Sequence, residues 1–329
     1  MKLLRCFVVV LSFAMTCSAA ELPKCYQSMN RVTWIVQNVD RVSVAWKALG
    51  LSDIKQTPHV QFSGEYRGKP VTIRAEQVTG HIGNLTVDFI QPDKGQANAF
   101  SGFLSSHGDG IFSFIFQVSS RQEMEKEIQR MRSLGVDVLQ QLTVEENGKP
   151  VTFTYFNTQP QGKYVLGLVY SPGAPAATSG KAIVSHFGAV VQEIPPVSAY
   201  WQRLGFQPIP IEHATPRKDM QYRNKPLWFY FDVGFQRINP QLAIEWISAP
   251  ATPPNIYADY LKLHGEGIQH IGMPVEDLSK TVAAYENHGY GIWQAGAWGD
   301  VGKKDSGQYK YMDTNSIGGI SVELLHAYK

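Results

Sequence analysis

The chain has 329 residues, of which 43% are hydrophobic and 18% are charged, and its formal net charge at pH 7 is +2. This balance is that of an ordinary globular protein long enough for two domains. Lysine and arginine are scattered, without a basic stripe interleaved with aromatic residues, so the sequence predicts no nucleic-acid partner.

The first twenty residues have the pattern of a secretory signal peptide. Lys2 and Arg5 precede an apolar run over residues 6–17, and Ser18-Ala19-Ala20 supplies the small residues at which signal peptidase cleaves. The run is shorter than the roughly 20 residues that a spanning helix needs. We therefore expect cleavage after residue 20, a secreted or periplasmic location, and no membrane insertion of the mature chain.

A lipoprotein signal that ends at Cys17 is the alternative, although residues 14–16 match the residues before a lipidated cysteine poorly. Cleavage after residue 20 would leave Cys25 as the only cysteine. No internal disulfide is then available, even in an oxidising compartment.

The first half of the mature chain, residues 21–172, contains two successions of a strand and a helix. The pattern predicts a strand over 32–36 with a helix over 41–49, then a strand over 112–118 with a helix over 121–134. A segment rich in proline and small residues, 173–181, predicts a linker.

The same succession occurs twice more in residues 182–329. Strands are predicted over 183–191 and 267–275, and each is followed by a helix, over 197–204 and 278–288, that a glycine closes, Gly205 and Gly289 respectively. Runs rich in β-branched and aromatic residues follow and predict further strands, at 227–233, 241–247, 309–312 and 319–325. The unit is therefore a strand, a helix and several strands, used four times in an α+β chain.

The two halves are copies of one another. Val42-Ser43-x-x-Trp46-x-x-Leu49-Gly50 recurs as Val197-Ser198-x-x-Trp201-x-x-Leu204-Gly205, an offset of 155 positions (42 to 197). Tyr66-Arg67-Gly68-Lys69-Pro70 recurs as Tyr222-Arg223-Asn224-Lys225-Pro226 at nearly the same offset. Two copies in one chain provide an internal control, because residues that only the fold requires should recur in both.

Only the second copy carries a plausible set of metal ligands. Its two opening strands contain His186 and His270 in the same local pattern, and its closing strands contain Glu245 and Glu323 at matching places. Equivalent positions in repeated strands face the same way. Two imidazoles and two carboxylates suit one divalent ion of zinc, iron, nickel, cobalt or manganese, and the set alone does not choose among them.

Transfer of these four positions to the first copy gives Arg31, Asp88, Ser113 and Gly167, of which only Asp88 is a common metal ligand. A guanidinium beside a carboxylate makes a charge-assisted pair. We therefore expect Arg31 and Asp88 to meet where the second copy would hold its ion, and we interpret the first domain as degenerate.

The chain resembles the vicinal oxygen chelate superfamily in three segments: His186-Phe187-Gly188, His270-Ile271-Gly272, and Asp313-Thr314 through Gly318-Gly319-Ile320-Ser321-Val322-Glu323-Leu324. Its members include glyoxalase I, methylmalonyl-CoA epimerase, extradiol dioxygenases and bleomycin-resistance proteins. The resemblance covers the mature chain at the level of the repeat. It implies four βαβββ units paired into two cupped mixed-sheet domains, with the metal ligands pointing into the second cup.

The glyoxalase and epimerase pattern implies that all four residues bind the metal and that Glu323 or Glu245 removes a proton next to a carbonyl, giving an epimerase, isomerase or lyase. Export counts against a CoA or glutathione substrate, so a small oxygenated metabolite is expected. Two groups of residues could contact the substrate at the rim of the cup: Tyr222, Arg223 and Lys225, or else Trp293, Trp298, Lys303 and Lys304. The first group recurs in both copies and therefore fits a turn better.

Two alternatives stay open at this point. The extradiol dioxygenase pattern implies iron on His186, His270 and Glu323, but the chain lacks that family's histidine ahead of a tyrosine, and Glu245 would have no assigned role. A binding protein without turnover, similar to bleomycin-resistance proteins, is the other. A homodimer is compatible with all three interpretations.

Overall fold

The computed structural model describes residues 22–27, 29–173, 183–215, 219–238 and 243–329. The signal peptide predicted over 1–20 and all but the first residue of the linker predicted over 173–181 lie outside the described residues, so those boundaries stay predictions. Within the described residues, no helix combines the length and the apolar character that crossing a membrane would require.

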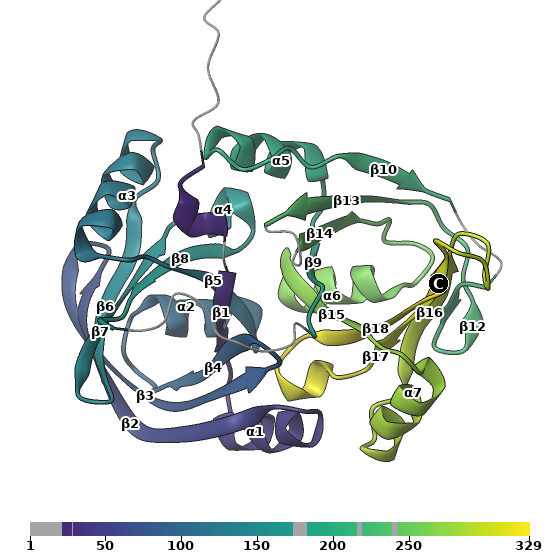
Figure 1. Cartoon of the computed structure of the whole chain (residues 1–329), viewed down its shortest axis with the longest axis horizontal. Helices are drawn as coiled ribbons and strands as arrows, with labels where there is room; N and C mark the ends of the chain where they lie inside the picture. The colour runs from purple at the N-terminus through teal and green to yellow at the C-terminus, as the bar shows by residue number, and fades with distance from the viewer. Residues whose placement is uncertain (1–21, 28, 174–182, 216–218, 239–242) are drawn as a thin grey trace, which may run out of the picture.

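The first half of the chain forms a closed eight-stranded barrel (Figure 1). Its strands are, in spatial order, β1 (Met29–Ile35), β4 (Leu85–Pro92), β3 (Lys69–Ile82), β2 (Ser52–Tyr66), β6 (Val138–Glu146), β7 (Lys149–Phe156), β8 (Val165–Tyr170) and β5 (Gly110–Gln117). Helices α1 (Val39–Ala48) and α3 (Arg121–Ser133) lie outside the barrel, and α2 (Ala99–His107) packs Phe100 and Phe103 into its interior. The short helices η1 (Lys24–Gln27) and α4 (Gln159–Gly162) complete this half.

The second half forms a curled ten-stranded sheet that stays open. Its strands are, in spatial order, β10 (Ile211–Ala214), β13 (Phe231–Arg237), β14 (Ala243–Ser248), β9 (His186–Val190), β15 (Gly267–Pro274), β18 (Ser321–Ala327), β17 (Gly307–Met312), β16 (Ile292–Trp298), β11 (Gln221–Tyr222) and β12 (Lys225–Pro226). The helices are α5 (Ile194–Arg203), α6 (Ile256–His264), α7 (Leu278–Asn287) and η2 (Asn315–Ile317).

Strand pairing confirms the prediction of four βαβββ units in two cupped mixed sheets. In each unit the opening strand pairs in parallel with the closing strand, as β1 does with β4, β5 with β8, β9 with β14 and β15 with β18. The two opening strands of each half then pair antiparallel, β1 with β5 and β9 with β15. Each cup is therefore built from two units that are neighbours in the sequence.

Local signals explain where the elements begin and end. The Asn38 side chain accepts a hydrogen bond from the Arg41 amide at the start of α1, and Asp277 caps α7 in the same way. Gly205 and Gly289 end α5 and α7 with φ of 93° and 87°, as the sequence predicts.

The strand predicted over 227–233 begins later than expected, at Phe231. Residues 227–230 bury Leu227 and Phe229 and expose Trp228 and Tyr230 without pairing as a strand. The alternation of buried and exposed side chains is that of a strand, so the sequence pattern alone extends the element too far.

The motif that recurs around Tyr66 and Tyr222 is a hairpin turn in both halves. Arg67 and Gly68 join β2 to β3 with φ of 51° and 71°, and Arg223 and Asn224 join β11 to β12 with φ of 49° and 61°. Two successive positive φ values match the right-handed twist of the strands that a tight turn connects. The turn interpretation of this motif is therefore confirmed.

The two sheets share one apolar cluster, and the contacts between them repeat. Trp46 of α1 donates its indole hydrogen to the Ile317 carbonyl at 2.9 Å, and Trp201 of α5 donates to the Gly162 carbonyl at 3.2 Å. Each tryptophan thus reaches the connection ahead of the last strand of the other sheet. The tryptophan that the two copies share therefore serves packing between the sheets.

Candidate metal centre

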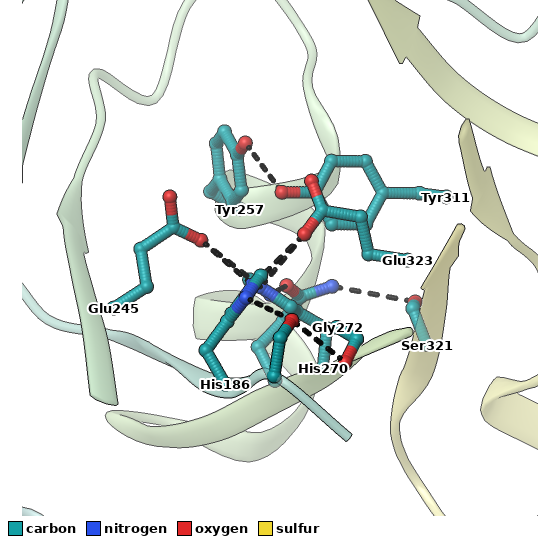
Figure 2. Close-up of polar contacts among 10 residues, drawn as sticks. His186, Glu245, Tyr257, His270, Gly272, Tyr311, Ser321 and Glu323 are labelled. Carbon is teal, nitrogen blue, oxygen red and sulfur yellow. Dashed lines mark hydrogen bonds and ion pairs between the residues drawn. The ribbon is translucent and has the colours of Figure 1, made fainter. Parts of the chain in front are cut away.

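The second sheet brings four predicted side chains together on its concave face (Figure 2). His186 lies on β9, Glu245 on β14, His270 on β15 and Glu323 on β18. His270 is fully buried, His186 and Glu323 nearly so, and Glu245 is the most accessible of the four. All four come from the opening and closing strands of the two units, as the repeat predicts.

The donor atoms of the four side chains point at a common centre. His186 Nε2 lies 2.9 Å from Glu323 Oε2 and 3.2 Å from His270 Nε2, and His270 Nε2 lies 3.1 Å from Glu245 Oε2. One donor atom from each residue lies within 4.8 Å of the others. Because Zn²⁺ and similar ions bind imidazole nitrogen and carboxylate oxygen at about 2.0–2.2 Å, one ion could contact all four.

Strand register explains this convergence. One row across the sheet contains Glu245, Gly188 and His270, on β14, β9 and β15. The next row contains His186, Gly272 and Glu323, on β9, β15 and β18. In each row a glycine lies between a histidine and a glutamate, so the two side chains that flank it can lean toward one another.

The outer ring nitrogens of both histidines have hydrogen-bond partners. Ser185 Oγ lies 3.1 Å from His186 Nδ1, and the Gln269 side-chain oxygen accepts from His270 Nδ1 at 2.7 Å. The Gln269 amide in turn donates to Ser321 Oγ at 3.3 Å. Such partners fix the ring orientation and direct Nε2 toward the centre. Sequence reasoning missed these residues, although Ser185 and Gln269 each directly precede a histidine.

The charges of the cluster favour ionised side chains. Burial alone would lower the pKa of His186, but the hydrogen bonds that its imidazole donates to Glu245 and Glu323 outweigh burial and raise that pKa well above its ordinary value. Burial alone would raise the pKa of Glu245, and contacts with His186 and His270 instead lower it. Without a metal, therefore, two carboxylates hold a proton on the imidazole of His186.

The first barrel has an ion pair at the equivalent place, as the sequence predicts. Register places Arg31, Asp88, Ser113 and Gly167 at the positions of His186, Glu245, His270 and Glu323. Arg31 Nε contacts the Asp88 carboxylate, and Arg31 Nη2 lies 2.9 Å from the second oxygen of Asp88 and 3.0 Å from Glu146 Oε1. The guanidinium thus supplies the positive charge at the centre of this barrel.

In the first barrel, larger side chains stand at the positions that glycines occupy in the second sheet. Thr33 and Ile115 occupy the positions of Gly188 and Gly272. A Cβ on Gly167 would lie 2.4 Å from the Ile115 side chain, so a glutamate could not be placed there without displacing it. The first barrel therefore differs from the second sheet in packing at these positions as well as in residue types.

Comparison with known proteins agrees with this architecture. Residues 185–306, which include both histidines and Glu245, match the family model described as the glyoxalase/bleomycin resistance protein/dioxygenase superfamily. The chain has the vicinal oxygen chelate fold. No curated protein matches the chain.

Solved structures with this vicinal oxygen chelate fold resemble the chain over most of its length. A triple mutant of 4-hydroxymandelate synthase from Streptomyces coelicolor has a TM-score of 0.60 at 14% identity, covering 92% of this chain and 94% of that one. An Mn(II)-bound glyoxalase from Novosphingobium aromaticivorans has a TM-score of 0.51 at 14% identity, covering 92% and 83%. A fusion of a xylose isomerase-like TIM barrel with 4-hydroxyphenylpyruvate dioxygenase has a TM-score of 0.51 at 12% identity, covering 92% and 49%.

A cavity of about 570 Å³ opens onto the cluster. Its wall contains His186, Glu245 and Glu323 together with mostly aromatic and aliphatic side chains, among them Met220, Phe231, Val233, Phe235, Tyr257, Trp298, Tyr309, Tyr311 and Leu325. Of the rim residues considered from the sequence, Trp298 lines this cavity. Tyr222, Arg223, Lys225, Trp293, Lys303 and Lys304 are not among its lining residues.

Two of the lining tyrosines form a pair next to the cluster, and sequence reasoning did not identify them. Tyr257 of α6 and Tyr311 of β17 place their hydroxyl oxygens 3.2 Å apart (Figure 2). Burial raises the pKa of both phenols well above the ordinary value, so both stay protonated at neutral pH.

Proposed function

We propose that this protein is an exported enzyme that binds one divalent metal ion through His186, Glu245, His270 and Glu323. The proposed reaction is removal of a proton from a carbon next to a carbonyl of a small oxygenated metabolite, with an epimerase, isomerase or lyase outcome. The likeness of the fold to a manganese-bound glyoxalase supports a metal-dependent reaction, and the cavity size supports a small-molecule substrate.

The observation that carries this proposal is the presence of two carboxylates at one pair of imidazoles. Glu323 and Glu245 lie 2.9 Å and 3.5 Å from the same nitrogen of His186. A bound metal would polarise the substrate carbonyl as a Lewis acid. Three protein ligands suffice to hold a catalytic metal of this kind, so the second carboxylate is available as a base.

We propose that Glu245 is the ligand that leaves the metal to act as the base, and that Glu323 stays bound. Both side chains line the cavity, but that of Glu245 is 14% exposed and that of Glu323 only 5%. A base needs to reach the substrate with a carboxylate oxygen that is free to accept the proton. Glu245 would take the proton from carbon and return it to the same or a neighbouring carbon, which balances an isomerisation without a further reactant.

A first experiment measures metal content by mass spectrometry on the mature protein purified without chelators. The expected result is about one divalent ion per chain, lost in His270→Ala and kept in Ser113→Ala, the matched position in the first barrel. No metal in the wild type after incubation with zinc, iron, nickel, cobalt or manganese would refute the proposal and favour a ligand-binding protein without turnover.

A second experiment tests the reaction. The metal-loaded protein is incubated in D₂O with a panel of small hydroxyketones and hydroxy-keto acids, and ¹H NMR follows loss of the signal next to the carbonyl. Loss that needs both the metal and Glu245 supports proton abstraction. Oxygen-independent exchange equal in wild type and Glu245→Gln would contradict the assignment of the base.

A second candidate function is oxidative, and the names of two similar structures support it. Two of the similar structures carry the names 4-hydroxymandelate synthase and 4-hydroxyphenylpyruvate dioxygenase. His186, His270 and Glu323 alone would make the two-histidine, one-carboxylate set of iron oxygenases. Oxygen uptake that depends on ferrous iron and survives Glu245→Gln would support this candidate over the first.

A further inference from the structure

The two halves share an aromatic pair in the interior of each cup. The helices α2 and α6 begin alike, after the cap residues Asn98 and Asn255, so Phe100 and Tyr257 occupy equivalent positions. Tyr155 and Tyr311 are equivalent as well, since they pair with Gly167 and Glu323.

The geometry of the two pairs is nearly the same. The rings of Phe100 and Tyr155 are 5.6 Å apart at 88°, and those of Tyr257 and Tyr311 are 6.0 Å apart at 88°. An aromatic ring therefore occupies the helix position in both cups. The hydroxyl of Tyr257 is an addition that occurs only in the half with the His and Glu cluster.

The two equivalent strand tyrosines, Tyr155 and Tyr311, have different hydrogen-bond partners for their hydroxyl groups. In the first barrel, Tyr155 pairs with Thr33 Oγ1 at 3.3 Å. The equivalent of Thr33 in the second sheet is Gly188, which has no side chain. Tyr311 pairs instead with the hydroxyl of Tyr257 at 3.2 Å.

Two hydroxyl groups that share one hydrogen bond have two hydrogens, and only one of these lies between the oxygens. The other hydrogen is available to a third group. Both tyrosines line the cavity together with Glu245 and Glu323, and Figure 2 shows the pair beside Glu323. A substrate bound at the cluster would fill this cavity, and one of its oxygens could then accept this second hydrogen.

We propose that Tyr257, oriented by Tyr311, donates a hydrogen bond to a substrate oxygen in this cavity. The inference rests on the proposed metal site and adds a second contact to the substrate, from a helix rather than from the sheet. A donor fixed in a buried site stabilises negative charge that develops on an oxygen. The phenol keeps its proton, so the proposed proton transfer between carbon and Glu245 stays balanced.

The test uses 4-nitrocatechol, a coloured ligand with two adjacent oxygens, and the full mature protein loaded with Mn²⁺. The variant is Tyr257→Phe, which installs the side-chain type found at the equivalent position of the first barrel. The control is Tyr260→Phe on the same helix, because the Tyr260 hydroxyl donates to the Ile268 carbonyl at 2.9 Å and does not line the cavity. Manganese content, the dissociation constant of the probe and the position of its bound absorption band are measured.

We expect one Mn²⁺ per chain in the wild type and both variants. Tyr257→Phe should bind the probe about tenfold more weakly, because a hydrogen bond to a charged oxygen is lost. The absorption band of the bound probe should shift in that variant alone. Equal affinity and an unshifted band in manganese-loaded Tyr257→Phe would overturn the inference and leave the metal site standing. A wild type that binds no Mn²⁺, or binds the probe equally well after His270→Ala, would overturn the metal site and this inference together.

Discussion

Gly272 lies directly opposite His186 in the antiparallel pairing of β15 with β9, and a Cβ on Gly272 would come within 2.1 Å of the imidazole carbon Cε1 of His186. Gly188 stands in the same relation to His270, at 1.7 Å. Real side-chain atoms do not approach this closely, so the imidazoles occupy space that only glycine leaves. The glycine two residues after each histidine thus makes room for the other histidine.

Gly272→Ala should therefore disable the cluster. The added methyl group would push the His186 ring away from Glu323, and overpacking of this kind costs about 1–3 kcal/mol of folding free energy. We expect a folded protein with a lowered unfolding midpoint and a metal content well below one ion per chain. Calorimetry and mass spectrometry on the same preparation would measure both.

Gly291→Ala is the matched control, because an added Cβ there would meet open space in the same half of the molecule. It should bind metal as the wild type does. Full metal content in Gly272→Ala would show that the imidazole can bind from another orientation, against the register argument.

Metal binding should release a proton at neutral pH. Hydrogen bonds that His186 donates to Glu245 and Glu323 overcome the effect of burial and raise the pKa of His186 in the metal-free protein, so its imidazole carries a positive charge at neutral pH. A metal ligand must be neutral imidazole. Affinity should then fall about tenfold for each unit by which pH drops below that pKa. Calorimetric titration in buffers of different ionisation enthalpy counts the released protons, and a count of zero would contradict the prediction.

The two glutamates should respond differently to loss of charge. Glu323→Gln should reduce metal affinity strongly, because Glu323 is the carboxylate nearest His186 and is almost fully buried. Glu245→Gln should retain most of the metal and lose proton exchange by about a hundredfold or more, the scale of a general base. Metal content and the NMR exchange rate, measured together, separate a ligand from a base. Equal metal loss in both variants would make Glu245 a ligand of the same rank.

The repeat predicted four similar units, and the resemblance to the vicinal oxygen chelate superfamily implied that they pair into two cupped sheets. His186, Glu245, His270 and Glu323 could be placed on equivalent strands from sequence because side chains alternate along a strand and the two copies align at offsets of 155 to 157 positions. Most element types followed from periodicity, but helices α2 and α6 were not predicted, and at residues 227–230 an alternating aromatic segment does not pair as a strand.

The surroundings of the cluster could not be predicted in the same way. Tyr257 lies on α6, a helix absent from the sequence-based expectations, and it reaches the cavity only because the sheet curls around that helix. The orienting contact of Gln269 with Ser321 depends on strand pairing across 52 positions. Such contacts are set by tertiary geometry, which a single sequence does not record.

The ion pair in the first barrel should stabilise the fold without affecting the metal site. The side chains of Arg31 and Asp88 are 12% and 2% exposed, and Thr79 and Gln77 also donate to Asp88, at 2.7 Å and 3.2 Å. Arg31→Met would leave the buried carboxylate without its cation, at a cost of about 3–5 kcal/mol of unfolding free energy. Adding Asp88→Asn removes the stranded charge while keeping an acceptor, so the double variant should recover part of the loss. Urea unfolding gives the free energy of unfolding of the wild type, Arg31→Met and the double variant. The metal content of both variants should equal that of the wild type. A double variant less stable than Arg31→Met would show that Asp88 is held mainly by its other hydrogen bonds.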